Sequence, residues 1–292
     1  MNTQSNERMD QANALLQGGK PQDAEALCRE ILSEQENNSE VDETRSRAFH
    51  LLGFLALMRG NSQEGLENLS QAARFPSENP HVFMHLGIAQ ASLGRAQEAT
   101  ANLQKSVAME PSLAEGHYNL GLTLFNLGRF DEAENSFRQT IQLNPQYADA
   151  EERLGTILHK RKDLAQALEH LDRALEIDPG HLAALNQKGM TLTAQDKTPQ
   201  AHACFEKAIG LSPEAGDILL NLGMCCRTLY KNEEALSHFR KCVQVRPDWP
   251  DAHATLGWVL EKNQDADEAR QVLETAMRMD GDHPQANLTQ ER

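Results

Sequence analysis

The sequence predicts an all-α protein built from stacked pairs of antiparallel helices, and a glycine period is the first of three observations that lead to this fold class. Glycines recur every 34 residues within apolar stretches, at Gly53, Gly87, Gly121, Gly155, Gly189, Gly223 and Gly257. Glycine inside a helix costs about 1 kcal/mol relative to alanine, so seven of them indicate repeated close contact between helices. A constant period of this length is typical of helical repeat solenoids.

The second observation is that small and large residues keep the same phase after each glycine. Twelve residues on stands an alanine in every unit but the first, which has Gly65. Sixteen residues on stands a leucine or phenylalanine, namely Leu69, Leu103, Phe137, Leu171, Phe205, Phe239 and Leu273. This alternation of small and large groups predicts one packed helical face in each unit.

The third observation is a set of prolines that separate the units. They stand twenty-four residues after the glycine, at Pro111, Pro145, Pro179, Pro213 and Pro247. Because proline has no backbone N–H and a fixed φ, each one stops a helix and precedes the next. Each unit is therefore predicted to contain two antiparallel helices.

This pattern of glycine, alanine, large apolar residue and proline resembles the tetratricopeptide repeat. The resemblance covers residues 46–283 as seven repeats, with a degenerate hairpin at 1–38 and a short tail at 284–292. It implies a right-handed solenoid of about eight helical hairpins. An acidic insertion shifts the period by seven residues, so residues 39–45 are expected to form a hinge.

Composition narrows the classes of partner. A net charge of −15 argues against nucleic acid and anionic membranes, and it favours basic or neutral protein partners, although surplus acid also keeps a long array soluble. The N-terminus lacks a secretory apolar segment, and the longest apolar stretch, 49–58, is too short to span a bilayer, so we expect a cytoplasmic protein. The five cysteines show no paired spacing and are expected to be reduced.

The resemblance implies that the first helix of each repeat lines a concave groove. The side chains expected to contact an extended peptide or a partner helix there are amides, aromatic rings and a few charges. They are Tyr118, Asn119, Phe125, Arg153, Asn186, Gln187, Asn221, Arg227 and Trp258. Aromatic and arginine residues are the commonest anchors of protein interfaces.

Two rows of groove residues have alternative interpretations. The amides of Asn119, Gln187 and Asn221 offer a donor and an acceptor to a bound main chain, similar to the asparagine ladder of the O-linked N-acetylglucosamine transferase family. Alternatively, these amides join adjacent repeats. The acidic row comprises Glu115, Asp149, Asp217 and Asp251. These carboxylates either hold basic side chains or stabilise the first turns of their helices through the macrodipole.

Three histidines suggest a possible metal site as one of two interpretations. His81 and His85 are four residues apart on one expected groove helix, and His50 is in the neighbouring repeat. No third oxygen or sulfur ligand is evident, so polar groove histidines are the favoured interpretation, and we expect neither a metal nor a cofactor.

The sequence contains no phosphate-binding loop, nucleophile elbow or helical metalloprotease motif, so no enzymatic activity is expected. The alternative is an accessory module that recruits substrates for a bacterial glycosyltransferase or sulfotransferase system, since similar arrays precede such enzymes. The last hairpin is expected to self-associate or to dock a partner through Val272, Leu273, Met277 and Met279, because too few residues follow it to form a capping helix.

Overall fold

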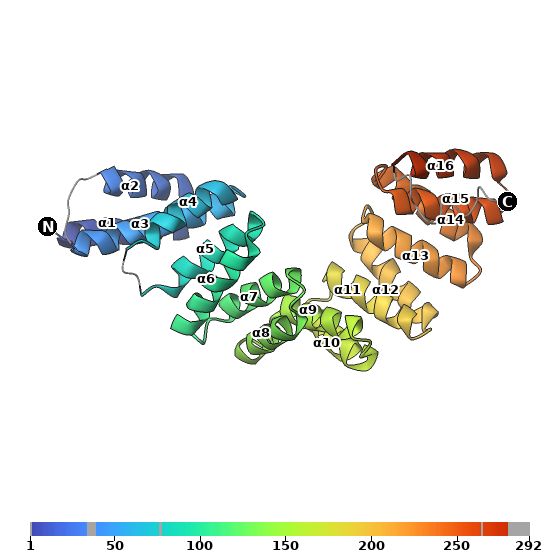
Figure 1. The fold of residues 1–292 in the computed structure, drawn as a ribbon, viewed down its shortest axis with the longest axis horizontal. Helices are drawn as coiled ribbons and strands as arrows, with labels where there is room; N and C mark the ends of the chain where they lie inside the picture. The colour runs from blue at the N-terminus through green and yellow to red at the C-terminus, as the bar shows by residue number, and fades with distance from the viewer. Residues whose placement is uncertain (1, 34–38, 76–77, 264, 280–292) are drawn as a thin grey trace. The chain divides into compact units, whose positions relative to one another are not determined.

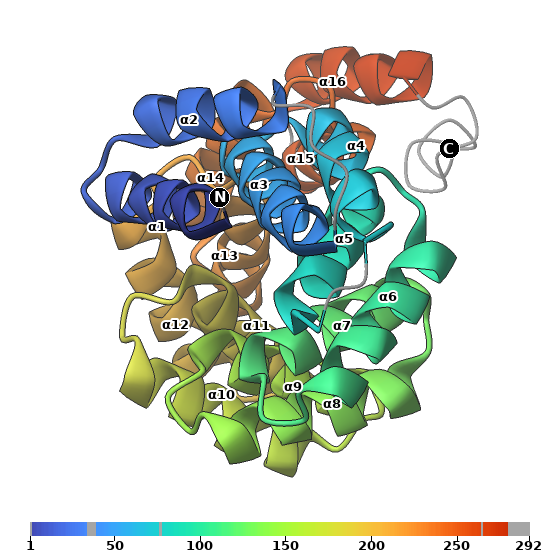
Figure 2. The same cartoon turned by 90° about the vertical axis from the view of Figure 1, so that its left-hand side faces the viewer.

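The computed structural model describes residues 2–33, 39–75, 78–263 and 265–279. In this part of the chain the regular secondary structure consists of sixteen helices and no strand (Figures 1 and 2). Successive helices pack as hairpins, so the predicted all-α solenoid of eight helical pairs is confirmed. The chain divides into two compact units, residues 1–145 and 146–292.

The first unit contains four hairpins. Its helices are α1 (Asn2–Gln17), α2 (Pro21–Ser33), α3 (Ser39–Met58), α4 (Ser62–Ala72), α5 (Pro80–Ser92), α6 (Ala96–Met109), α7 (Ala114–Asn126) and α8 (Phe130–Leu143). In the hairpin of α1 and α2, which the sequence marks as degenerate, Ala12, Ala24 and Cys28 are fully buried. The hairpin therefore keeps the small-residue packing of the later repeats.

The second unit contains the other four hairpins. Its helices are α9 (Ala148–Lys160), α10 (Leu164–Ile177), α11 (Leu182–Ala194), α12 (Thr198–Leu211), α13 (Gly216–Thr228), α14 (Asn232–Val245), α15 (Pro250–Lys262) and α16 (Ala266–Met279). The first helices of successive hairpins also contact one another, α9 with α11 and α11 with α13. This arrangement places their equally phased residues on one surface.

The glycine period marks the contact between the two helices of a hairpin. A Cβ atom added at any of the seven glycines would lie 2.5–2.8 Å from a side-chain atom of the residue sixteen positions on. At Gly223, for example, it would lie 2.5 Å from the Phe239 ring. Real Cβ atoms do not come this close to their neighbours, so the helices pack at a distance that only glycine allows.

The prolines and the turns within hairpins also follow the period. Each of the five prolines lies two residues beyond the end of a helix, as predicted. Within hairpins, a residue with positive φ recurs every 34 positions. It is a glycine in the first unit, at Gly60, Gly94 and Gly128, and Lys162, Asp196 or Tyr230 in the second. The second unit therefore holds side chains in a backbone region that disfavours a Cβ atom.

Replacing Tyr230 by glycine is expected to stabilise the second unit by about 1 kcal/mol, because relief of left-handed strain exceeds the entropy that glycine adds to the unfolded chain. Tyr230 has φ 60° and is 91% exposed, so no buried contact is lost. Urea unfolding followed by circular dichroism measures the change. The converse replacement, Gly128→Tyr at φ 74°, is expected to destabilise the first unit. A shift in the same direction for both variants would contradict this account.

The acidic segment 39–45, expected to be a hinge, is helical instead. It forms the start of α3, which has 20 residues where α5 has 13. Seven added residues make about two helical turns, so the later residues of α3 point in the same directions as their equivalents in the other repeats. The Thr44 hydroxyl donates to Asn6 Oδ1 at 2.9 Å, and Thr44 is buried. The inserted turn that carries Thr44 thus packs on α1, because helical propagation and this contact outweigh the acidic composition.

The cysteines are all free thiols, as the sequence predicts. Cys28, Cys225, Cys226 and Cys242 are buried. Burial raises the pKa of the Cys28, Cys226 and Cys242 thiols to about 11. These thiols are therefore protonated at neutral pH and pack as small apolar groups.

Among the described residues, no helix is both long and apolar enough to cross a membrane.

Candidate functional site

The nine predicted groove residues fall in both units. Tyr118, Asn119 and Phe125 lie on α7 in the first unit, and the other six lie on α9, α11, α13 and α15 in the second. The two sets are therefore surfaces of separate units, and the second set is the larger.

Two amides of the second unit join adjacent repeats. Asn221 Nδ2 on α13 donates to Asn186 Oδ1 on α11 at 3.0 Å. This is the contact that the alternative interpretation of the amide row describes. A primary amide has a second donor hydrogen, and its carbonyl oxygen accepts two bonds, so each side chain retains capacity toward a ligand. The bond also holds both amides in a defined orientation.

A second cross-repeat contact lies on the next pair of first helices. The guanidinium carbon of Arg227 on α13 lies 4.6 Å from the centroid of the Trp258 ring on α15. At this distance the cation is attracted to the face of the indole ring. Met224 lies one helical turn from both Asn221 and Arg227 and is 37% exposed. We call Asn186, Gln187, Asn221, Arg227 and Trp258 the amide–tryptophan surface.

A concave pocket of about 520 Å³ adjoins this surface. It is lined by Thr156, His159, Lys160, Lys162, Leu164, Gln187, Met190 and Ala194. His159 Nδ1 lies 3.0 Å from Thr191 Oγ1, and burial, followed by the nearby Lys160 charge, lowers the pKa of His159. The imidazole is therefore neutral at pH 7. The pocket has the size of small-ligand and side-chain sites in proteins, with two lysines at its rim.

Arg153, Tyr118, Asn119 and Phe125 contact their own repeats. Arg153 Nε lies 3.3 Å from the buried Glu152 carboxylate. The Tyr118 ring lies 5.9 Å from the Phe137 ring, and Phe125 meets Phe130 edge to face at 5.3 Å. Asn119 Nδ2 donates to the main-chain oxygen of Glu115 at 2.8 Å. These side chains therefore contribute to packing within the hairpin of α7 and α8 or within α9.

The four acidic residues lie in first helical turns, as the macrodipole interpretation requires. All four are exposed. Asp149 Oδ1 lies 3.1 Å from His181 Nε2, and Asp251 Oδ2 accepts from the Trp249 indole at 3.2 Å. Two of the four carboxylates thus bind groups of their own unit, and their role toward a partner stays a prediction.

The three histidines considered as metal ligands meet in the first unit. His50 Nε2 lies 2.9 Å from His85 Nδ1, and the rings stack at 5.1 Å. The His81 ring lies 6.3 Å from that of His85. A pocket of about 310 Å³ is lined by Met9, Asn13, Arg47, His50, Leu51, Phe54, Asn79, His81 and His85. The facing nitrogens of His50 and His85 bind each other, so a metal ion would have to break this bond.

The stability of the first unit is expected to fall by about 2 kcal/mol between pH 7.5 and pH 5.5 through His50 and His85. Burial above all, and then neighbouring histidines, lowers their pKa from 6.5 to about 4 and about 3. The unfolded chain therefore binds more protons below pH 6.5, and stability declines from there until the folded pKa values are reached. Urea unfolding at several pH values measures the slope. A His50→Gln and His85→Gln double variant with an unchanged slope would contradict the assignment.

The last hairpin differs from its prediction. Leu273 is buried against Gly257, and Val272 and Met277 are partly buried against the apolar cores. Met279 is the exposed member of the four, at 42%. Most of this apolar stripe is thus covered by α15, because α16 packs into the glycine contact like the earlier second helices. The prediction that Leu273 is exposed on an apolar surface is therefore wrong. The tail 284–292 lies outside the described residues.

Sequence reasoning missed two groups of polar residues that the fold brings together. Glu151 and His170 form a pair across α9 and α10, and His202, Cys226 and Glu234 meet across α12, α13 and α14. Neither group has a motif spacing, and their members come from different helices. A helical-phase map of each repeat is the signal that would have placed them near one another.

Models of one protein family match the sequence of this chain, and several solved structures share its fold. One tetratricopeptide repeat model matches residues 118–181 and 186–252, and a second matches 228–291, which together make more than half of the chain. No curated protein sequence matches it. The link to glycosyltransferases and sulfotransferases stays a prediction.

Three solved structures illustrate the likeness. A chain of the APC/C hetero-tetramer Cut9–Hcn1 has a TM-score of 0.69 at 16% identity, covering 97% of this chain and 54% of that one. This chain thus spans about half the length of that relative. PilF of Pseudomonas aeruginosa has a TM-score of 0.66 at 17% identity over 73% of this chain and 96% of its own. YrrB, described as having an unusual peptide-binding site, has a TM-score of 0.52 at 24% identity, covering 64% of this chain and 96% of its own. At sequence identities this low, the three structures establish a shared fold and nothing about function.

Proposed function

The chain belongs to the tetratricopeptide repeat family, and we propose that it is a non-catalytic scaffold whose amide–tryptophan surface binds an extended segment of a protein partner. The observation that carries this proposal is the pair of cross-repeat contacts, Asn186 with Asn221 and Arg227 with Trp258. They place two amides, a guanidinium and an indole on the first helices of adjacent repeats. YrrB, which shares the fold, is a repeat protein with a peptide-binding site.

The amides favour an extended segment over a partner helix. A main chain in extended conformation presents N–H and C=O groups that Asn and Gln side chains can bind. The main-chain groups of a helix already bind each other and leave such amides without a role. The bond between Asn186 and Asn221 orients both amides before a ligand arrives, which lowers the entropy lost on binding.

Trp258 and Arg227 supply the anchor. Tryptophan and arginine are enriched among the residues that dominate binding energy at interfaces. The exposed methionines Met190 and Met224, at 38% and 37%, give an adaptable apolar surface beside them. The pocket of about 520 Å³ next to Gln187 has room for an inserted side chain.

Charge supports a basic or neutral partner. The chain carries a net charge of −15, and Asp217 and Asp251 are exposed at the first turns of α13 and α15. A strongly acidic segment would be repelled by this field. A segment with lysine or arginine beside an apolar anchor fits both the carboxylates and the indole.

The test is a peptide selection, followed by binding measurements on two variants that each lose the tryptophan of an arginine–tryptophan pair. The protein selects binders from a displayed library of random peptides, and fluorescence anisotropy gives their dissociation constants. Trp258→Ala is expected to weaken binding by at least about 30-fold, since a dominant interface residue contributes about 2 kcal/mol or more. The chain also offers a control, because the Arg246 guanidinium lies 4.3 Å from the Trp249 ring, off this surface. Trp249→Ala, which leaves the amide–tryptophan surface intact, is expected to weaken binding far less than Trp258→Ala does.

Two outcomes would overturn the proposal. Selected peptides that bind Trp258→Ala and wild type equally place the binding elsewhere. Equal losses for Trp258→Ala and Trp249→Ala indicate a general loss of structure. An Asn186→Ala and Asn221→Ala double variant separately tests whether the amides bind the peptide main chain, in which case every selected sequence loses affinity by a similar factor.

A further inference from the structure

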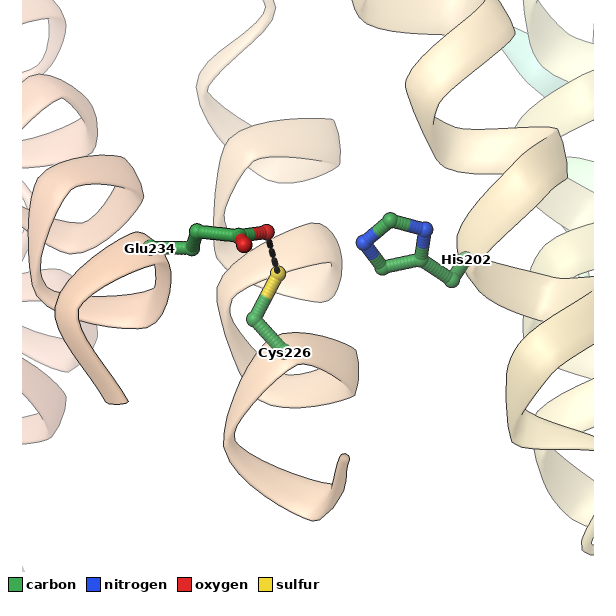
Figure 3. Close-up of side chains that lie close together, drawn as sticks. All are labelled: His202, Cys226 and Glu234. Carbon is green, nitrogen blue, oxygen red and sulfur yellow. Dashed lines mark hydrogen bonds between the residues drawn. The ribbon is translucent and has the colours of Figure 1, made fainter. Parts of the chain in front are cut away.

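Three side chains with different metal-binding atoms meet in the second unit. They are His202 on α12, Cys226 on α13 and Glu234 on α14. One donor atom from each, a ring nitrogen, the sulfur and a carboxylate oxygen, lies within 4.8 Å of the other two. Figure 3 shows the His202 ring with one nitrogen directed toward the Cys226 and Glu234 side chains. His202 and Cys226 are buried, and Glu234 is exposed.

The His202 ring is prepared to act as a ligand. The residue is 8% exposed, and its buried Nε2 has no hydrogen-bond partner. A Glu206 carboxylate oxygen lies 3.4 Å from Nδ1 on the other side of the ring. A carboxylate at Nδ1 favours the tautomer that carries the proton there, which leaves the lone pair on Nε2. The fold thus keeps a buried acceptor that no group of the protein satisfies, next to a thiol and a carboxylate.

We propose that His202, Cys226 and Glu234 bind a divalent transition-metal ion of the zinc type. Imidazole nitrogen, thiolate sulfur and carboxylate oxygen are the donors that zinc takes in proteins, at about 2.0–2.3 Å. Tetrahedral ligands at such lengths lie about 3.5 Å apart, so the three donors need to approach by about 1 Å. The exposed Glu234 side chain can supply its part of this movement, and small rotations of the His202 and Cys226 side chains supply the rest. A fourth position remains for water.

The ion would join three consecutive helices of neighbouring repeats. Cys226 Sγ already lies 4.0 Å from Glu234 Oε2, so the thiol proton occupies part of the space that the metal would take. On binding, that proton leaves to solvent, and the sulfur and the carboxylate bind the metal. Because His202 belongs to one hairpin and the other two ligands to the next, the ion would stabilise the contact between hairpins.

Lys231 competes for the same carboxylate. Its Nζ lies 3.1 Å from Glu234 Oε2, and both side chains are exposed. A metal ion would displace this ammonium group, which has a flexible stem and access to water. Lys231→Ala is therefore expected to raise metal affinity several-fold, whereas removal of a cation far from the site leaves it unchanged.

Cobalt(II) titration of the untagged full chain tests the site. Wild type is expected to bind one equivalent with a thiolate-to-cobalt charge-transfer absorption, and zinc(II) is expected to abolish that absorption by displacement. Cys226→Ser removes the absorption, and the matched variant Cys225→Ser, which alters the adjacent buried thiol, retains it. No absorption in wild type, or an absorption retained in Cys226→Ser, overturns the proposal.

A second variant keeps the proposal testable if Cys226→Ser does not fold. Glu234 is exposed, so Glu234→Gln keeps the helical circular dichroism spectrum. It is expected to lower zinc affinity, measured by competition with cobalt, by about 100-fold or more, since even residues that only orient a ligand contribute 10- to 100-fold. His202→Gln is expected to do the same. Unchanged affinity in a folded Glu234→Gln or His202→Gln variant would exclude these residues as ligands.

Discussion

Replacing Phe239 by alanine is expected to lower the free energy of unfolding of the second unit by about 4 kcal/mol. The Phe239 ring is fully buried and covers Gly223 at the contact between α13 and α14. Removing a buried phenylalanine costs about 3–5 kcal/mol, because the apolar transfer energy is lost and a cavity remains. Backbone atoms at the glycine contact line that cavity, so the helices cannot close it easily.

Urea unfolding and amide hydrogen exchange measure this effect and its location. Exchange is expected to accelerate most in α13 and α14 and next in the hairpins that pack on them, since repeat stability depends on neighbours. Leu211→Ala is the control within the same unit, because Leu211 is 52% exposed and its replacement leaves no cavity. Equal effects of Phe239→Ala and Leu211→Ala would show that the glycine contact contributes little to stability.

Replacing His170 by leucine is expected to destabilise the second unit by about 3 kcal/mol. His170 Nδ1 on α10 donates to Glu151 Oε2 on α9 at 2.6 Å, and the Glu151 side chain is 3% exposed. Without His170 the carboxylate loses this donor while it stays buried. Breaking a buried pair by removing one partner costs about 3–5 kcal/mol, and the partial exposure of His170 places the expectation at the lower end.

A double-mutant cycle separates the pair from its surroundings. Glu151→Leu together with His170→Leu is expected to recover most of the lost stability, because no buried carboxylate then remains. The coupling energy is read from urea unfolding of the four proteins. Additive effects of the two single replacements would mean that Glu151 finds another donor or reaches water.

Periodicity in the sequence predicted the helical pairs, the glycine contacts within each pair and the prolines between successive repeats. These features depend on residue type at a given phase, and every repeat places that phase in the same environment. The residue sixteen positions after each glycine lies against that glycine in all seven repeats. Where a short insertion changed the phase, the acidic composition wrongly predicted a hinge. Residues 39–45 begin the helix α3 instead, and Thr44 in this segment bonds to Asn6 of α1.

Pairing between polar side chains could not be predicted in this way. Asn221 was predicted to contact either a ligand or the adjacent repeat, and only the structure shows that its amide donates to Asn186. Tyr118 was predicted to line the groove, and its ring packs on Phe137. Such choices depend on the distance and rotation between neighbouring helices, to tenths of an ångström and a few degrees, because hydrogen bonds are short and directional. The same holds for His202, Cys226 and Glu234, which share no motif and meet through helix packing. Local residue preference thus suffices for the repeated helical pairs, whereas the identity of each polar contact arises from how those pairs pack.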